Sequence, residues 1–331
     1  MTYSSGGLIQ ATDYNSFVST GTPNVNATWS TLYGQTALTT VSTGGTVSAL
    51  QWSNLNTDVY KMGQHQGTAV SAVSGSPVAG DLIAYIATLS TDITNTYNNR
   101  FNAASQGSQY TTFSGTVSKT TNTGSGSSPW TITFTSTVTF ASAIAATSFF
   151  NAGGLLKIQF NKQSTGTVAD TEWNTFIGSS GAGGTVASAV YLSSDATSKN
   201  LPGFSGVAGT FKSGGTGTPT TLASGTGFNQ LTSSPTTIYQ QFDSGSAYSS
   251  NYVQITAAYN SSTFVLTLVT TWYDNGDANP GSTAQITGGT ATTGNPISWG
   301  TAPATLVTYI PPESTNLSPT WGTPSINGAV A

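Results

Sequence analysis

The sequence predicts an α+β protein: a small helical N-terminal module followed by a β-rich, sandwich-like region, in a chain that we expect to form oligomers. Apolar residues recur at helical spacing up to about residue 105, and Thr-rich segments of alternating polarity follow from about residue 109. Aromatic residues make up 11% of the 331 residues, which is enough to build cores, whereas only 5% are charged. We therefore expect a helical module over 1–107, a β-rich domain over 108–295 and a Pro-rich extended arm over 296–331.

The composition excludes several classes of function. With 7 basic and 11 acidic residues the net charge is −4, so no basic surface can neutralise several phosphates, and we expect no nucleic-acid partner. The absence of cysteine removes disulfides and thiolate chemistry, and His65 is the single histidine, so we predict no cofactor, no metal and no catalytic residue. No apolar run is long enough to span a bilayer and the first residues do not resemble a secretory signal, which predicts synthesis in a cytoplasm without membrane insertion.

The helical module contains an internal repeat. Residues 6–17 align with residues 44–55 in the pattern G-G-x-[IV]-x-A-x-x-[YW]-x-x-[FL]. The pattern describes a glycine turn, a short extended entry and a capped helix with its aromatic and apolar residues on one face, so it indicates a duplicated helical unit. Between the two copies, residues 25–33 form a short helical stripe that Gly34 closes.

The second copy begins a longer helix. Ser48 and Gln51 have the spacing of a capping box, and apolar residues follow at helical spacing, which predicts a helix that ends at Gly63. His65 would then lie in the loop after this helix.

A further helix is predicted from about Asp81 to Ala104. Its apolar stripe contains Leu82, Ile86, Leu89 and Ile93, whose 4-3-4 spacing is that of a coiled-coil seam. These four residues are our candidates for an oligomer seam. The stripe is equally consistent with packing against the core of its own chain.

The β-rich region opens with a clear strand at 130–140, where alternate residues are apolar except for Ser136. Further strands are expected at 156–160 and in a hairpin of 252–258 and 263–272, with helices at 141–150 and 170–177. From residue 296 onward six prolines favour an extended arm over a central strand.

Few residues suggest chemistry. The loop from Asp274 through Asp277 to Asn279 has the oxygen-rich composition of a calcium site, but it has only two carboxylates, and a tight turn after a strand explains it better. A glycosidase would need two carboxylates that converge in a groove, for which Asp170, Glu172, Asp274 and Asp277 are the candidates. Acidic residues such as Asp13, Asp58 and Asp92 are better explained as helix caps and exposed positions.

Several short segments resemble structural proteins of tailed bacteriophages, especially cyanophages. The opening Tyr3–Asn15 matches their G-x-L-I-x-A-x-D-Y-N pattern, and the segment from Gln51 to Asn54 resembles a weaker second copy in which Ser53 replaces the usual asparagine. The segments Phe149–Gly154 and Ser314–Pro324 are also similar to this group. The resemblance implies a virion component, commonly a homotrimeric tail fibre or tail-associated protein, and it implies no catalytic residues.

Three functions follow from these observations. The leading hypothesis is a structural virion protein of the tail, its fibres or the baseplate, made in the host cytoplasm, whose partners are further copies of itself, other virion proteins and a host surface glycan. A capsid decoration or cement protein is the alternative, since it would share the same composition. A glycan-depolymerising tailspike is the second alternative.

Overall fold

The computed structural model of the chain describes residues 10–71, 86–100, 102, 113–118, 121–123, 130–161, 173, 176, 190–193, 212–213, 231–242, 250–274, 285–287 and 304–330. Its elements are α1 (Ala11–Val18), α2 (Val25–Thr28), α3 (Ala49–Gln66), α4 (Ile86–Asn98), β1 (Phe113–Ser118), β2 (Thr121–Thr123), β3 (Trp130–Thr139), α5 (Ala143–Asn151), β4 (Leu155–Asn161), β5 (Val190–Ser193), β6 (Lys212–Ser213), β7 (Thr236–Phe242), β8 (Tyr252–Asn260), β9 (Val265–Asp274), β10 (Gln285–Thr287), β11 (Ala304–Ile310) and β12 (Ser325–Val330).

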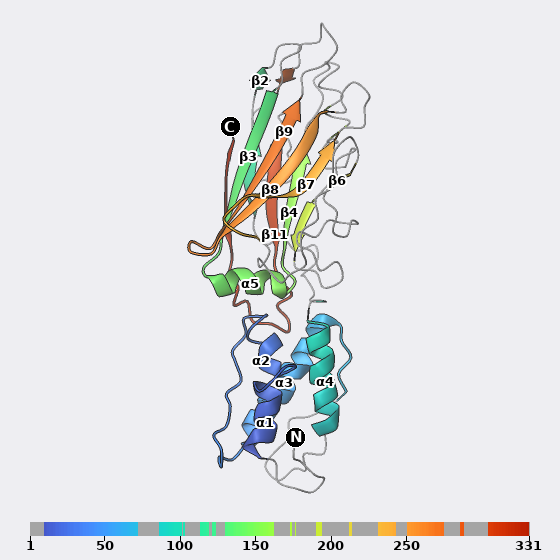
Figure 1. Ribbon diagram of the computed structural model, residues 1–331, viewed down its shortest axis with the longest axis vertical. Helices are drawn as coiled ribbons and strands as arrows, with labels where there is room; N and C mark the ends of the chain where they lie inside the picture. The colour runs from blue at the N-terminus through green and yellow to red at the C-terminus, as the bar shows by residue number, and fades with distance from the viewer. Residues whose placement is uncertain are drawn as a thin grey trace.

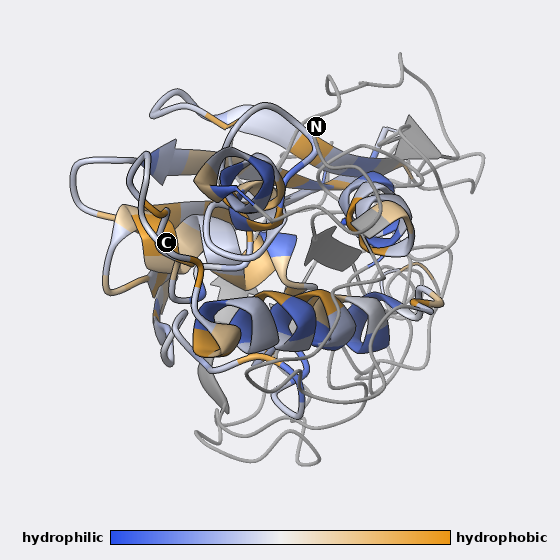
Figure 2. Cartoon of the chain, turned by 90° about the horizontal axis from the view of Figure 1, so that it is seen from below, coloured by the Kyte–Doolittle hydropathy of each residue, from blue (hydrophilic) through white to orange (hydrophobic). Residues whose placement is uncertain are grey.

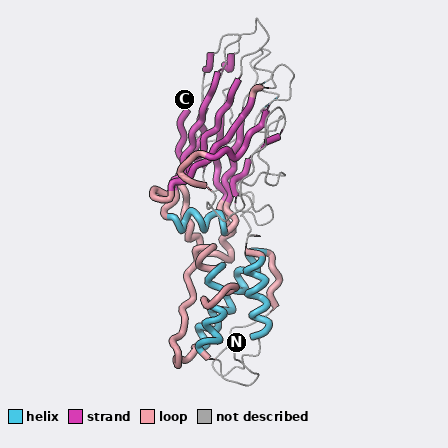
Figure 3. Tube along the Cα trace, viewed as in Figure 1, coloured by secondary structure: helices cyan, strands magenta, loops and turns pink. Residues whose placement is uncertain are grey.

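The α+β class predicted from the sequence is confirmed. Helices α1 to α4 gather at one end of an elongated molecule, and the strands fill the other end (Figure 1). Helix α5 lies across the end of the sheets that faces the helical module, so the two kinds of structure meet there (Figure 3).

The two copies of the sequence repeat begin their helices in the same way. Helix α1 starts one residue after Gln10, whose amide donates to the Asp13 carboxylate at 3.2 Å. Helix α3 starts one residue after Ser48, at the equivalent repeat position, and the Ser48 amide donates to the Gln51 side chain at 2.9 Å. The capping box predicted for Ser48 and Gln51 is therefore present, and it satisfies amides that a helix start leaves unpaired.

The repeat also places equivalent residues in one core. Tyr14 of α1 and Trp52 of α3 are both buried, and their ring centroids lie 6.2 Å apart. Phe17 contacts the same tryptophan edge to face, with ring centroids 6.1 Å apart. Viewed along the long axis, the helices carry apolar and polar stretches on different sides, as amphipathic helices do (Figure 2).

The strands form two main sheets that pack together. The six-stranded sheet has the order β12-β3-β9-β8-β7-β6 and the four-stranded sheet the order β1-β11-β4-β5, while β10 and β2 form a separate pair. All pairings are antiparallel except that of β6 with β7. Strands β1 and β11 contact β3, and β1 contacts β12, which joins the two main sheets.

The hairpin of β8 and β9 follows the predicted alternation. Odd-numbered residues of β8 and even-numbered residues of β9 are buried, so one face of the hairpin packs on the core. In β3 the buried positions include Ser136, the one polar residue in the otherwise apolar alternation. Ser136 lies on the same buried face of the strand as Ile132 and Phe134. The strand alternation therefore holds even where the residue is polar.

Helix α3 ends later than the sequence predicted. It continues to Gln66, and Gly67 ends it with a left-handed φ of +64°. Gly63 therefore lies inside the helix, and a side chain is excluded there because a Cβ would lie 2.8 Å from Val70 and 2.9 Å from the carbonyl of Thr68. His65 is consequently a residue of the last helical turn and not of a loop.

The C-terminal residues also differ from the extended arm expected over 296–331. Residues 304–310 form β11, a central strand between β1 and β4, and residues 325–330 form β12 at the edge of the other sheet. Neither strand contains proline, and Pro311, Pro312, Pro319 and Pro324 all lie in the segment between them. Proline therefore lies outside these strands, and among the described residues 304–330 the segment 311–324 is the part that belongs to neither β11 nor β12.

Candidate functional site

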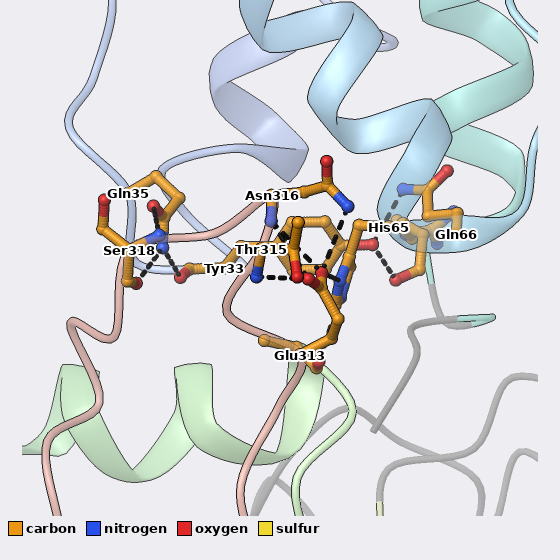
Figure 4. A network of polar contacts seen from close by, with 10 residues as sticks. Tyr33, Gln35, His65, Gln66, Glu313, Thr315, Asn316 and Ser318 are labelled. Atoms are coloured by element: carbon orange, nitrogen blue, oxygen red, sulfur yellow. Dashed lines mark hydrogen bonds and ion pairs between the residues drawn. The ribbon is translucent and has the colours of Figure 1, made fainter. Parts of the chain in front are cut away.

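The segment 311–324, between β11 and β12, returns to the helical module and forms a polar junction with it. Figure 4 shows side chains of this segment meeting residues of α3 and of the turn after α2. We treat this junction as the candidate functional site because it fixes one part of the molecule to the other.

His65 is at the centre of the junction. Its side chain is fully buried in the last turn of α3. Its Nδ1 lies 3.1 Å from Oε2 of Glu313 (Figure 4). Its Nε2 lies 3.0 Å from the carbonyl oxygen of Ala152, just after α5. One imidazole thus links α3, the end of α5 and the returning segment.

Glu313 is held in place by its own segment. Its carboxylate accepts hydrogen bonds from the amides of Thr315 and Asn316 and from the Asn316 side chain. Burial alone would raise the pKa of Glu313, but these hydrogen bonds and the one to His65 outweigh it and hold the pKa below its usual value. Burial lowers the pKa of His65 by more than its contacts with Glu313 and Ala152 raise it.

Gln35 forms a second link to the same segment. Its side-chain amide donates to the carbonyl of Ser318 at 2.9 Å and accepts from the amide of Ser318 at 2.9 Å, so it pairs with the backbone as a neighbouring strand would. The same amide group also donates to the carbonyl of Tyr33 and to the hydroxyl of Thr320. The contact uses no charge, so ionic screening does not weaken it.

Tyr33 ties the helices of the module together behind this junction. Its hydroxyl donates to the carbonyl of Arg100 at 2.6 Å and accepts from the side chain of Gln66 at 2.7 Å. Burial raises the pKa of Tyr33, so the hydroxyl stays protonated and can donate its hydrogen bond to the backbone carbonyl of Arg100. The ring also contacts that of His65 edge to face, with centroids 5.3 Å apart.

The structure places the predicted seam residues as follows. Leu89 and Ile93 are 1% and 3% exposed and belong to the core of their own chain, as the intrachain alternative expected. Ile86 is the first residue of α4, but its side chain lies outside the part that is described, and so does all of Leu82. Oligomerisation through this helix stays a prediction.

Asp274, the first residue of the suspected calcium loop, is buried and makes hydrogen bonds within the protein. The residue is 1% exposed, and its carboxylate accepts hydrogen bonds from Trp173 Nε1 at 2.8 Å and from the Asn251 side chain at 3.4 Å. Trp173 also stacks on Trp272, with centroids 5.7 Å apart and planes at 4°. These contacts give Asp274 a structural role at the end of β9, while Asp277 lies outside the described residues, as do Asp170 and Glu172.

Of the remaining predicted acidic positions, Asp13 caps the start of α1 as expected, but neither Asp13 nor Asp92 is exposed. Asp13 and Asp92 are each 2% exposed, and Asp92 accepts from the amide of Ser71 at 3.2 Å. Within the described residues, no group of three His, Cys, Asp or Glu side chains is placed to hold a metal ion. Among the same residues, no helix has the length and apolar character needed to cross a membrane.

No protein-family model, curated protein or solved structure matches the chain.

Sequence reasoning missed the role of His65 in this junction. It also gave Glu313 no partner, because the two residues are 248 positions apart. One signal was available: a single histidine close to the end of an amphipathic helix, in a chain with only two glutamates.

Proposed function

We propose that this protein is a structural virion component of a tailed bacteriophage, of the tail fibre or tail-associated kind, in which the helical module attaches to the particle and the β-rich region projects from it. The observation that carries the proposal is the junction at His65, Glu313, Gln35 and Ser318. It fixes a helical end and a β end into one elongated unit (Figure 1). A protein that transmits position or force along a particle needs such a fixed axis.

The chemistry of the junction supports the same role. Apart from the pair of His65 and Glu313, its contacts are made by amides, hydroxyls and backbone groups, so they depend little on ionic strength. A particle that passes between solutions of different salt content benefits from contacts of this kind. The assignment to a virion depends on the resemblance of two segments, the opening segment and Ser314–Pro324, to phage structural proteins.

The enzymatic alternative gains no support from the carboxylates that the structure describes. Asp13 caps α1, Asp92 binds the amide of Ser71, Asp274 binds Trp173 and Glu313 binds His65, so each has a structural partner. Asp58 is the exception, and no second carboxylate lines its pocket. A pair of the kind that glycoside hydrolysis requires is therefore absent from these residues.

Two measurements test the proposal. Light scattering on the purified full-length chain should give about 101 kDa, the mass of a trimer of 33.7 kDa chains. Immunogold labelling of phage particles with an antibody to this chain should place it on the tail. Labelling on the capsid lattice would favour the decoration protein instead, and the absence of the chain from purified particles would exclude a virion role.

A further inference from the structure

A polar pocket lies within the helical module, next to the junction. Its volume is about 380 Å³, within the range of sites for small ligands. One wall comes from α3 and another from residues 35–39, while Tyr14 and Trp29 add aromatic rings and Ser318 is contributed by the returning C-terminal segment.

The two walls are held by identifiable contacts. On α3 the lining residues Gln51, Asn54 and Asp58 follow one another at spacings of three and four, so they share one face of the helix. On the other wall the side chain of Asn26 pairs with both the amide and the carbonyl of Leu38, at 2.9 Å each. The pocket is therefore built by ordered segments and does not depend on a loose loop.

Asp58 stands out in this lining because it is the one acidic or basic residue among the described lining residues and has no direct partner there. Within the part of the chain that is described, its carboxyl makes no hydrogen bond and no ion pair. Burial raises the pKa of Asp58 to about 7, although Lys61 one turn along the helix acts to lower it. A carboxylate that is half-buried without a donor is costly unless a ligand supplies one.

A second polar group of the pocket also lacks a partner. The hydroxyl of Tyr14 is buried and makes no hydrogen bond to any residue that the structure describes. Native proteins pair most buried polar atoms, so an unpaired hydroxyl and an unpaired carboxyl in one pocket are an unusual combination. Both would gain from a molecule that brings hydrogen-bond donors and acceptors into this space.

The remaining lining defines the chemistry of that molecule. The side chains of Thr36, Thr39, Gln51, Asn54 and Ser318 offer hydroxyls and amides, and no Lys, Arg or His is present among the lining residues. A phosphate, sulfate or carboxylate would meet only Asp58 as a charge and would be repelled. The lining is therefore complementary to a ligand that carries hydroxyl groups and a single positive charge.

We propose that this pocket binds a small hydroxyl-rich ligand that carries a protonated amino group, an amino sugar or amino polyol, with the ammonium group paired to Asp58 and the hydroxyls bound by the amide of Asn54 and the NH2 group of Gln51. The side-chain oxygen of Gln51 is already bonded to Ser48. This site goes beyond the proposed virion role and does not depend on it. If the pocket does not bind such a ligand, the result expected from immunogold labelling of phage particles stays the same.

Two probes that differ in one group test the proposal. Glucamine carries an ammonium group where sorbitol carries a hydroxyl, and the two are otherwise the same polyol. By isothermal titration of the full-length chain at pH 8, glucamine should bind at least about 10-fold more tightly than sorbitol, which corresponds to one compensated charge. Equal affinity of the two probes, or no binding of glucamine at 10 mM, would overturn the proposal.

The pH dependence provides a test that needs no variant. Asp58 is the group of the pocket whose charge changes between pH 8 and pH 5, because its pKa lies at about 7 and burial keeps Tyr14 neutral. Glucamine should therefore bind at least about 10-fold more weakly at pH 5 than at pH 8, whereas sorbitol should bind equally at both. An unchanged affinity for glucamine would contradict the pairing with Asp58.

Variants then locate the site. Asp58→Asn should reduce the affinity for glucamine to that for sorbitol, and Asn54→Ala should weaken both probes by about threefold through a lost hydrogen bond. Tyr60→Phe, on the same helix but outside the lining, is the matched control and should leave both affinities unchanged. If Asp58→Asn keeps the preference for glucamine, the ammonium group is bound elsewhere and the proposal is wrong.

Discussion

The Nδ1 atom of His65 lies 3.1 Å from Oε2 of Glu313 and joins residues 248 positions apart in the chain. The contact connects the end of α3 to the segment between β11 and β12, whose neighbouring strands belong to two different sheets. Because the imidazole also contacts the carbonyl of Ala152 at the end of α5, it is shared by three parts of the fold. Loss of this side chain should therefore affect how the helical and β parts unfold together.

We expect His65→Ala to lower the free energy of unfolding by about 2–4 kcal/mol, because it leaves a cavity and removes a partner from Glu313. It should also separate one unfolding transition into two, since the helical module and the β region would lose a shared contact. Denaturant unfolding followed by circular dichroism and tryptophan fluorescence measures both effects. Gln64→Ala, at the exposed neighbouring position, is the control, and a variant that unfolds like this control would contradict the role of His65.

The junction should also weaken in acid. The pKa of His65 is lower in the folded chain than its ordinary 6.5, so as the pH falls below 6.5 the unfolded chain binds a proton first and stability decreases. The pKa of Glu313 is likewise below its ordinary 4.5, so its contribution is complete above that pH and is lost as the pH falls through the lower folded value. Both groups therefore act in the same direction.

His65→Gln isolates the histidine part of this effect because glutamine does not titrate. The difference in unfolding free energy between the natural protein and this variant should narrow as the pH is lowered from 7 to 5. A difference that stays constant over this interval would mean that the pKa of His65 is the same in the folded and the unfolded chain, which would contradict the lowered folded value.

Asp58 should show the opposite dependence on pH. Burial raises its folded pKa to about 7, so its contribution to stability is complete below its ordinary value of 3.8 and is lost as the pH rises through about 7. Asp58→Asn should therefore be more stable than the natural protein at pH 8, by about 1 kcal/mol once water reaching the partly exposed carboxyl is allowed for, and equally stable near pH 4. Lys61→Gln should be less stable than the natural protein at pH 8, because it removes the charge that opposes the burial penalty. Thermal melts across this pH range measure the profile, and an Asp58→Asn variant that is less stable at pH 8 would refute the assignment.

Local features of the fold could be predicted from the sequence because short spacings encode them. The capping box of Ser48 and Gln51, the shared helix starts of the repeat and the alternation of β8 and β9 each depend on neighbours within a few residues. The helix expected over 141–150 corresponds to α5 for the same reason.

Features that depend on distant contacts could not be predicted. Gly63 has the pattern of a helix end, but its missing side chain makes room for Val70, and the helix continues because Gly67 provides the left-handed turn. The prolines after residue 296 indicated an arm, yet β11 takes a central position because its own seven residues contain none and pair on both sides. The contact of His65 with Glu313 required the fold itself, since nothing near either residue indicates the other.

A substitution at Gly34 tests how tightly the helical module packs against α5 and the segment 311–324. It has a left-handed φ of +67°, and a Cβ added there would lie 2.8 Å from Cβ of Ser148 on α5 and 3.0 Å from the hydroxyl of Thr320. Gly34→Ala should therefore cost both backbone strain and a displacement of the helical module from α5, together about 2–4 kcal/mol.

Gly44→Ala is the matched control because it isolates the strain. Gly44 also has a left-handed φ, +80°, but a Cβ there would meet nothing within 4 Å, so we expect a loss of only about 1 kcal/mol. Chemical unfolding of both variants measures the difference, which reports the cost of crowding at the junction alone. Equal losses in the two variants would show that α5 and the helical module can move apart freely, and the fixed axis on which the proposed function rests would then be excluded.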